Sequence, residues 1–100
     1  MQTDDEATQL KNVKGINTHI IALTSENLNT RVHTELVYLR NSNINGPTSG
    51  DYSYSYLMVL RGEGSNDLVQ YIFGRGTDKI WKRVGQTDGT FGAWKSITFT

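Results

Sequence analysis

The chain has 100 residues, with ten lysines and arginines balanced by ten aspartates and glutamates, and it contains no cysteine. This length fits one domain with one hydrophobic core. Zero net charge disfavours nucleic acid as a partner, because nucleic-acid binders neutralise phosphates with a basic surface. The lack of cysteine excludes disulfides and thiolate metal ligands. No apolar run approaches the roughly 20 residues of a membrane-spanning helix, so we expect no membrane insertion.

The first 26 residues differ from the rest of the chain in the spacing of their apolar residues. Four apolar residues stand three, four and three positions apart, namely Val13, Ile16, Ile20 and Leu23. This is the spacing of a short coiled-coil seam. Gly15 within it is unfavourable in a helix by about 1 kcal/mol relative to alanine, and a strand over 18–23 or an unstructured linker fits equally well. We expect residues 1–26 to form a stalk or linker, and a stalk would need partner chains.

Residues 27–100 are rich in the patterns of β-strands and tight turns. Tyr52, Tyr54 and Tyr56 alternate with serines, which predicts that the tyrosines share one face of a strand. The apolar run 57–60 follows directly and should be buried on both faces. Five strands are predicted in all, over 32–40, 54–61, 68–74, 79–85 and 93–99. Glycine or asparagine lies in each gap, and short connections favour an antiparallel meander or sandwich-like domain.

The sequence shows no set of residues that indicates catalysis. His19 and His33 lie in different segments, and neither has a glutamate or histidine at metalloprotease spacing. The aspartates near the turns suit backbone capping, although a glycosidase-like pair depends on distance in space and is left open. The 74–76 Gly-Arg-Gly step lacks the lysine-serine ending of a phosphate loop. We expect no enzymatic activity, no metal site and no cofactor.

The aromatic residues are the best candidates for ligand binding. Aromatic faces beside hydroxyls and arginines suit sugar rings, because the C–H face of the sugar stacks and its hydroxyls form hydrogen bonds. Filling the core is the alternative for each ring, and we favour it for Tyr71 and Trp94. The arginines can instead pair with surface acids. The candidate ligand-binding residues are Tyr52, Tyr54, Arg75, Trp81 and Arg83.

A series of short motifs occurs in a characteristic order along three quarters of the chain. The motifs are Asn-Leu-Asn-Thr (27–30), Asn-Gly-Pro (45–47), Tyr-Leu-Met-Val-Leu (56–60), Gln-Tyr-Ile-Phe (70–73), Ile-Trp-Lys-Arg (80–83), Asp-Gly (88–89) and Ala-Trp-Lys (93–95). In this order they resemble the pyocin-knob domain of phage tail fibres and phage-tail-like bacteriocins. The family usually has a Pro-Gly step and an aromatic residue at the start of its first strand, whereas this chain has Arg-Val-His-Thr-Glu-Leu-Val-Tyr at 31–38.

The resemblance implies a small β domain in a homotrimeric fibre of a virion or a prophage-encoded tail-like particle. Its implied partners are bacterial surface polysaccharide, further copies of the chain and other tail-fibre domains. Neither catalytic residues nor a fixed ligand site transfer from the family, so the five candidates rest on their chemistry. A structural spacer or trimerisation module without a ligand is the second hypothesis, indicated if Tyr52, Tyr54 and Trp81 are all buried. A depolymerising enzyme, the third, needs two of the turn aspartates in one cleft.

Overall fold

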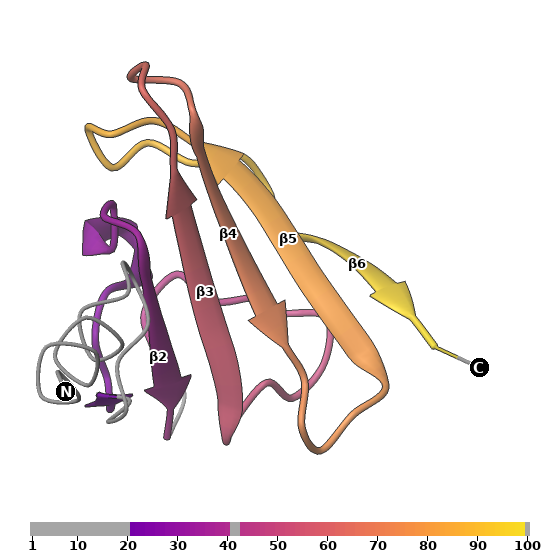
Figure 1. The fold of residues 1–100 in the computed structure, drawn as a ribbon. Helices are drawn as coiled ribbons and strands as arrows, with labels where there is room; N and C mark the ends of the chain where they lie inside the picture. Colours follow the sequence, from indigo (N-terminus) through magenta and orange to yellow (C-terminus); the bar gives the residue numbers. More distant parts are fainter. Residues whose placement is uncertain (1–20, 41–42, 100) are drawn as a thin grey trace, which may run out of the picture.

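A computed structural model of the chain describes residues 21–40 and 43–99. These residues form one mixed sheet of six strands in the order β1-β2-β3-β4-β5-β6 (Figure 1). The elements are β1 (Ala22–Leu23), the 3₁₀ helix η1 (Leu28–Thr30), β2 (Glu35–Leu39), β3 (Ser55–Arg61), β4 (Leu68–Phe73), β5 (Lys79–Gly85) and β6 (Lys95–Thr98). From β2 to β6 every neighbouring pair is antiparallel. The predicted mainly β fold is confirmed, and each of the five expected strands is present within three residues of its expected ends.

β1 lies within 18–23, the range for which a strand is the alternative to the helical seam. It pairs in parallel with β2, where Tyr38 N donates to Ile21 O (2.8 Å) and Arg40 N donates to Leu23 O (2.9 Å). Leu23 is buried in the core. The boundary expected between residues 26 and 27 therefore falls inside the folded unit, and the last residue of the expected helical seam is in a strand. The other seam positions, Val13, Ile16 and Ile20, lie outside the described residues.

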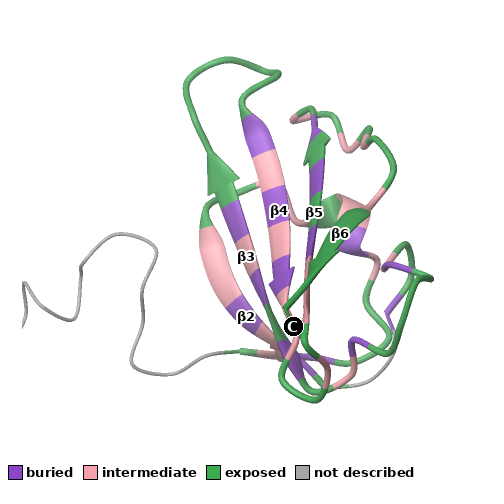
Figure 2. Cartoon of the chain, turned by 90° about the vertical axis from the view of Figure 1, so that its right-hand side faces the viewer, coloured by how far each residue is buried: buried purple, intermediate pink, exposed green. Residues whose placement is uncertain are grey.

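One face of the sheet, the inner face, carries the hydrophobic core. The register aligns four side chains in one row across β2 to β5, each at most 1% exposed, namely Val37, Leu57, Ile72 and Trp81. Leu28 of η1 and Tyr52 of the 43–54 loop pack on this face and belong to the same core cluster. Figure 2 shows the resulting alternation of buried and less buried residues along β4. Full burial of one such large side chain contributes roughly 1.5–3 kcal/mol.

The turns between the strands form as the glycine positions predict. Gly89 adopts a φ of 90°, and its N donates to Gln86 O at 3.0 Å. Asp88 Oδ1 accepts from Thr90 N at 3.0 Å. The hairpin between β3 and β4 closes through a hydrogen bond from Gly62 N to Asp67 O at 2.6 Å. A glycine that can adopt positive φ and an aspartate that accepts from a nearby backbone N–H are local features, so these turns can be predicted from the sequence.

One expectation for β3 is wrong for a single chain. Leu57 and Val59 are buried on the inner face, but Leu60, which points the other way, is 40% exposed. Loop segments cover the inner face, and they lie together on one side of the sheet in Figure 2. The outer face of β3 has no such cover among the described residues.

Candidate functional site

Two of the five predicted ligand-binding residues lie in the core. Trp81 is 0% exposed and Tyr52 is 6% exposed, and their rings meet edge to face with centroids 6.4 Å apart. The Tyr52 hydroxyl accepts from Asn43 N (2.7 Å) and donates to Asn43 O (2.8 Å). Trp81 Nε1 donates to Ser49 Oγ at 3.0 Å. Both rings fasten the 43–54 loop to the sheet, so neither offers a face to a ligand.

The tyrosines do not share one face, because a turn interrupts their alternation. Tyr54 adopts a φ of 57°, in the left-handed region that is uncommon for aromatic residues. Tyr52 precedes this turn and points into the core. Tyr54 lies in the turn and Tyr56 follows it, and they are 45% and 37% exposed. A period-two pattern reports a shared face only where the backbone stays extended.

Tyr54 and Arg75 come together at the end of the sheet where β3 begins. Arg75 Nε donates to Tyr54 O at 3.2 Å, and Arg75 N donates to Ser55 Oγ at 3.2 Å. The Tyr38 ring lies 6.5 Å from the Tyr54 ring and 5.3 Å from the Tyr56 ring. We call Tyr38, Tyr54, Tyr56 and Arg75 the tyrosine cluster. Exposed rings beside a guanidinium can stack on a sugar and donate hydrogen bonds to its hydroxyls.

Arg83 is a buried cation on the inner face. It is 5% exposed, and its Nε donates to Gln70 Oε1 at 2.8 Å. Its guanidinium carbon lies 3.9 Å from the Phe91 ring centroid and 4.5 Å from that of Trp94. No carboxylate pairs with it within the described part of the chain, and its Nη2 has no hydrogen-bond acceptor there. Burial lowers the pKa of Arg83 to about 10, so the group is charged at neutral pH.

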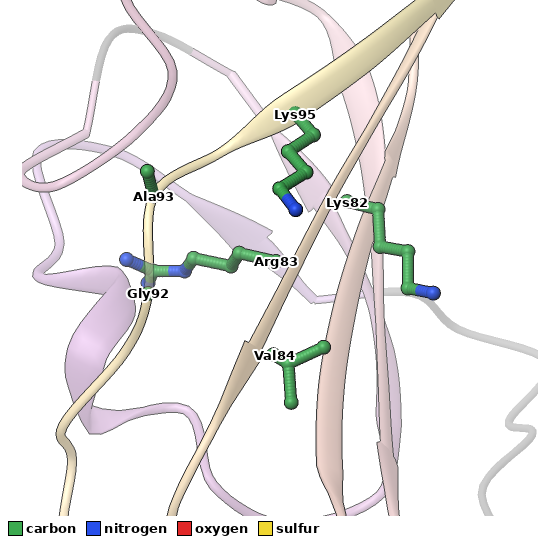
Figure 3. A pocket seen from close by; sticks show the side chains of 6 residues that line it. All are labelled: Lys82, Arg83, Val84, Gly92, Ala93 and Lys95. Carbon is green, nitrogen blue, oxygen red and sulfur yellow. The ribbon is translucent and has the colours of Figure 1, made fainter.

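A cavity of about 300 Å³ opens where β6 separates from β5 (Figure 3). Its lining consists of Lys82, Arg83, Val84, Gly92, Ala93 and Lys95, and we call it the basic pocket. In Figure 3 the Arg83 side chain extends toward Gly92 and Lys95 extends into the opening, whereas Lys82 points to the other side of β5. Three basic residues and no acid line the pocket, but the ammonium group of Lys82 points away from it. Such a lining favours an anionic group, since charge-assisted hydrogen bonds are about twice as strong as neutral ones.

Gln70, which is not among the predicted site residues, positions Arg83. Gln70 is fully buried on β4, and its Nε2 donates to Leu28 O (2.8 Å) and Arg31 O (2.9 Å). A polar residue at an inward position of an otherwise apolar strand is the signal that would have identified it. Lys95 gave no such signal, because its place in the pocket depends on where β6 leaves β5.

The candidate residues therefore belong to separate places. Tyr54 and Arg75 lie at the β2–β3 end of the sheet, and Arg83 lies in the basic pocket between β5 and β6. Throughout residues 21–40 and 43–99, three or more potential metal ligands do not gather, and no helix is long and apolar enough to cross a membrane. No protein-family model matches the chain, and neither a curated protein nor a solved structure shows significant similarity to it.

Proposed function

We propose that the chain is a non-enzymatic module of a phage tail fibre, or of a prophage-encoded tail-like particle, that binds polysaccharide on the bacterial host surface. The order of motifs along the chain supports the assignment to a fibre. The observation that carries the binding role is the composition of the basic pocket, where Arg83 is buried without an acidic partner and Lys95 extends into the opening. Its volume of about 300 Å³ lies at the lower end of ligand sites.

The pocket suits an anionic substituent of a sugar, such as a carboxylate. Lys95 Nζ would donate to the anion, and the charge of Arg83 would attract it from the inner side of β5. The Trp94 ring, which packs on the Arg83 guanidinium, fixes that charge in place. A single contact of this kind is weak. Three copies in a homotrimeric fibre, joined to other fibre domains, would raise the avidity by roughly 10²–10⁴-fold when they bind together.

The direct test is titration of the full chain with a panel of purified acidic and neutral bacterial polysaccharides. Lys95→Gln should weaken binding to the acidic members by about tenfold, or roughly 1.4 kcal/mol. The matched control is Lys79→Gln at the other end of β5, where Lys79 Nζ donates to Thr98 Oγ1 at 3.3 Å outside the pocket. Binding that is equal in both variants would remove the pocket from the proposal.

A structural spacer or trimerisation module without its own ligand is the second candidate. The burial of Tyr52 and Trp81 favours it, since two of the three rings that would indicate such a module lie in the core. The 45% exposure of Tyr54 does not fit this pattern. If no polysaccharide binds, and the full chain still forms a trimer, the structural role replaces the binding role.

A further inference from the structure

The outer face of the sheet is almost entirely apolar. The register places thirteen outward side chains of β2 to β6 in three cross-strand rows. The rows are Tyr38-Tyr56-Phe73-Ile80-Ile97, Leu36-Met58-Tyr71-Lys82-Lys95 and Leu60-Val69-Val84. Eleven of the thirteen residues are aliphatic or aromatic, and the remaining two are lysines. We call this surface the open face.

Such a face differs from what a water-facing sheet carries. An antiparallel sheet with one solvated face alternates apolar residues inward with polar residues outward. Here the outward positions are apolar as well, and several remain accessible: Leu60 is 40% exposed, Val84 54% and Ile97 60%. The described loops pack on the other face, where they complete the core with Leu28 and Tyr52. The outward residues therefore have the composition of a contact surface.

We propose that the open face packs against the open face of a second copy of this chain. The size of the face suits this occupant. Five strands spaced about 4.8 Å apart and three rows about 6.7 Å apart give about 400–500 Å² per copy. Two copies would then bury on the order of 1,000 Å², which reaches the lower limit for a specific interface. A second copy also brings a face of the same dimensions, apolarity and twist, as in sheet-on-sheet packing.

The charges on the face fit the same occupant. Both lysines, Lys82 and Lys95, are cross-strand neighbours at the β5–β6 margin, so the centre of the face is uncharged. An apolar centre with a polar rim is the usual anatomy of a protein–protein interface. The zero net charge of the chain also removes long-range repulsion between copies. Lys82, Val84 and Lys95 of this face also line the basic pocket, so the interface and a bound ligand would share this margin.

This inference rests on the self-association in the proposed function and names one surface through which copies meet. A face packed on the same face of another copy closes at two chains, so this contact joins copies in pairs and a homotrimer needs a further contact. The open-face contact is independent of the saccharide, so the two can fail separately. A chain that stays monomeric but binds polysaccharide would overturn the open-face contact alone. A chain that associates through this face without binding any polysaccharide would remove the binding role alone.

Sedimentation equilibrium of the full chain tests the contact, with Leu60→Glu and Tyr56→Glu as variants. Both residues point outward from β3 and are partly exposed, so the fold of one copy should tolerate the change. The wild-type chain should form dimers at micromolar concentration, and each variant should raise the dissociation constant by about 100-fold or more. Ile44→Glu is the control, since Ile44 is 57% exposed but lies in the 43–54 loop rather than on the open face.

Three outcomes would overturn the proposal. A monomeric wild-type chain is the first, and association that Leu60→Glu and Tyr56→Glu leave unchanged is the second. Equal loss of association in Ile44→Glu is the third, because it would show a nonspecific response to added charge. A monomer whose thermal midpoint falls sharply in Leu60→Glu would mean that another part of the same chain covers the face. Circular dichroism of every variant separates loss of association from loss of folding.

Discussion

Gln70 Oε1 accepts a hydrogen bond from Arg83 Nε at 2.8 Å, across the central β4–β5 pair and within the core. The same amide donates through Nε2 to Leu28 O and Arg31 O. One side chain thus connects the η1 segment to the cation beneath the basic pocket. Because every polar atom of Gln70 has a partner, the strand tolerates a buried amide at its centre.

Replacing Gln70 should therefore be strongly destabilising. Gln70→Leu nearly keeps the side-chain volume, but it leaves Arg83 Nε without its acceptor and removes the Gln70 donor from Leu28 O and Arg31 O. Leu28 O still accepts from Arg31 N. Buried groups left unpaired cost about 1–3 kcal/mol each, so we expect a loss of about 2–4 kcal/mol in the free energy of unfolding. Urea denaturation measures it, with the exposed Gln86→Leu as the control. A loss below about 1 kcal/mol would show that the network adds little stability.

The position of the Tyr52 ring should require glycine at residue 46. A Cβ at residue 46 would lie 2.2 Å from Tyr52 Oη and 2.4 Å from Cζ, closer than atoms can approach. Gly46→Ala should displace the ring from its bonds to Asn43 and destabilise the fold by about 1–3 kcal/mol. Gly76→Ala is the matched control, since a Cβ there meets no atom within 4 Å. Equal thermal midpoints for the two variants would contradict the packing described for Tyr52.

The buried Tyr52 hydroxyl should make stability fall at high pH. Burial raises the pKa of Tyr52 above its ordinary value of 10, and this outweighs the opposing hydrogen bond from Asn43. The unfolded chain therefore ionises at Tyr52 before the folded chain does. The stabilising contribution of the neutral phenol is complete below pH 10 and is lost as the pH rises through the raised pKa.

Tyr52→Phe isolates this effect. The variant should be less stable than the wild type near neutral pH by about 1 kcal/mol, because it lacks the hydroxyl's two hydrogen bonds. Above pH 10 the stability difference between wild type and variant should shrink. Unfolding free energies measured in parallel from neutral to alkaline pH test this. A stability difference that stays constant with pH would mean that Tyr52 ionises equally in both states.

Replacing Tyr54 tests whether the tyrosine cluster binds sugar. Tyr54→Ala removes an exposed ring, so the free energy of unfolding should change by no more than about 0.5 kcal/mol. If the tyrosine cluster contacts sugar, binding of the variant to host cells should weaken by about five- to tenfold. Binding to host cells and the thermal midpoint are measured on the same preparation. A large fall in the midpoint would instead identify Tyr54 as a packing residue, with the Tyr38 ring, whose centroid lies 6.5 Å away, as its neighbour.

The strands and turns are readable from the sequence because they depend on local features. Strand-forming runs separated by glycine or asparagine placed all five major strands, and Gly89 marks a turn whose positive φ favours glycine. The expectation that the 57–60 run is buried on both faces is wrong for the single chain, because composition does not show what covers the outer face. The pattern of the first 26 residues fits a helical seam and a strand over 18–23 equally well, and the pairing of β1 with β2 decides that 22–23 are in a strand.

Only the tertiary structure decided which aromatic residues are accessible. Tyr52 and Tyr54 look alike in the sequence, yet a left-handed turn and the closure of the 43–54 loop bury one ring and expose the other. Arg83 and Lys95 meet at one pocket only because β6 separates from β5. Local patterns report which side chains share a face. What covers that face depends on contacts between residues far apart in the chain, and no local pattern contains them.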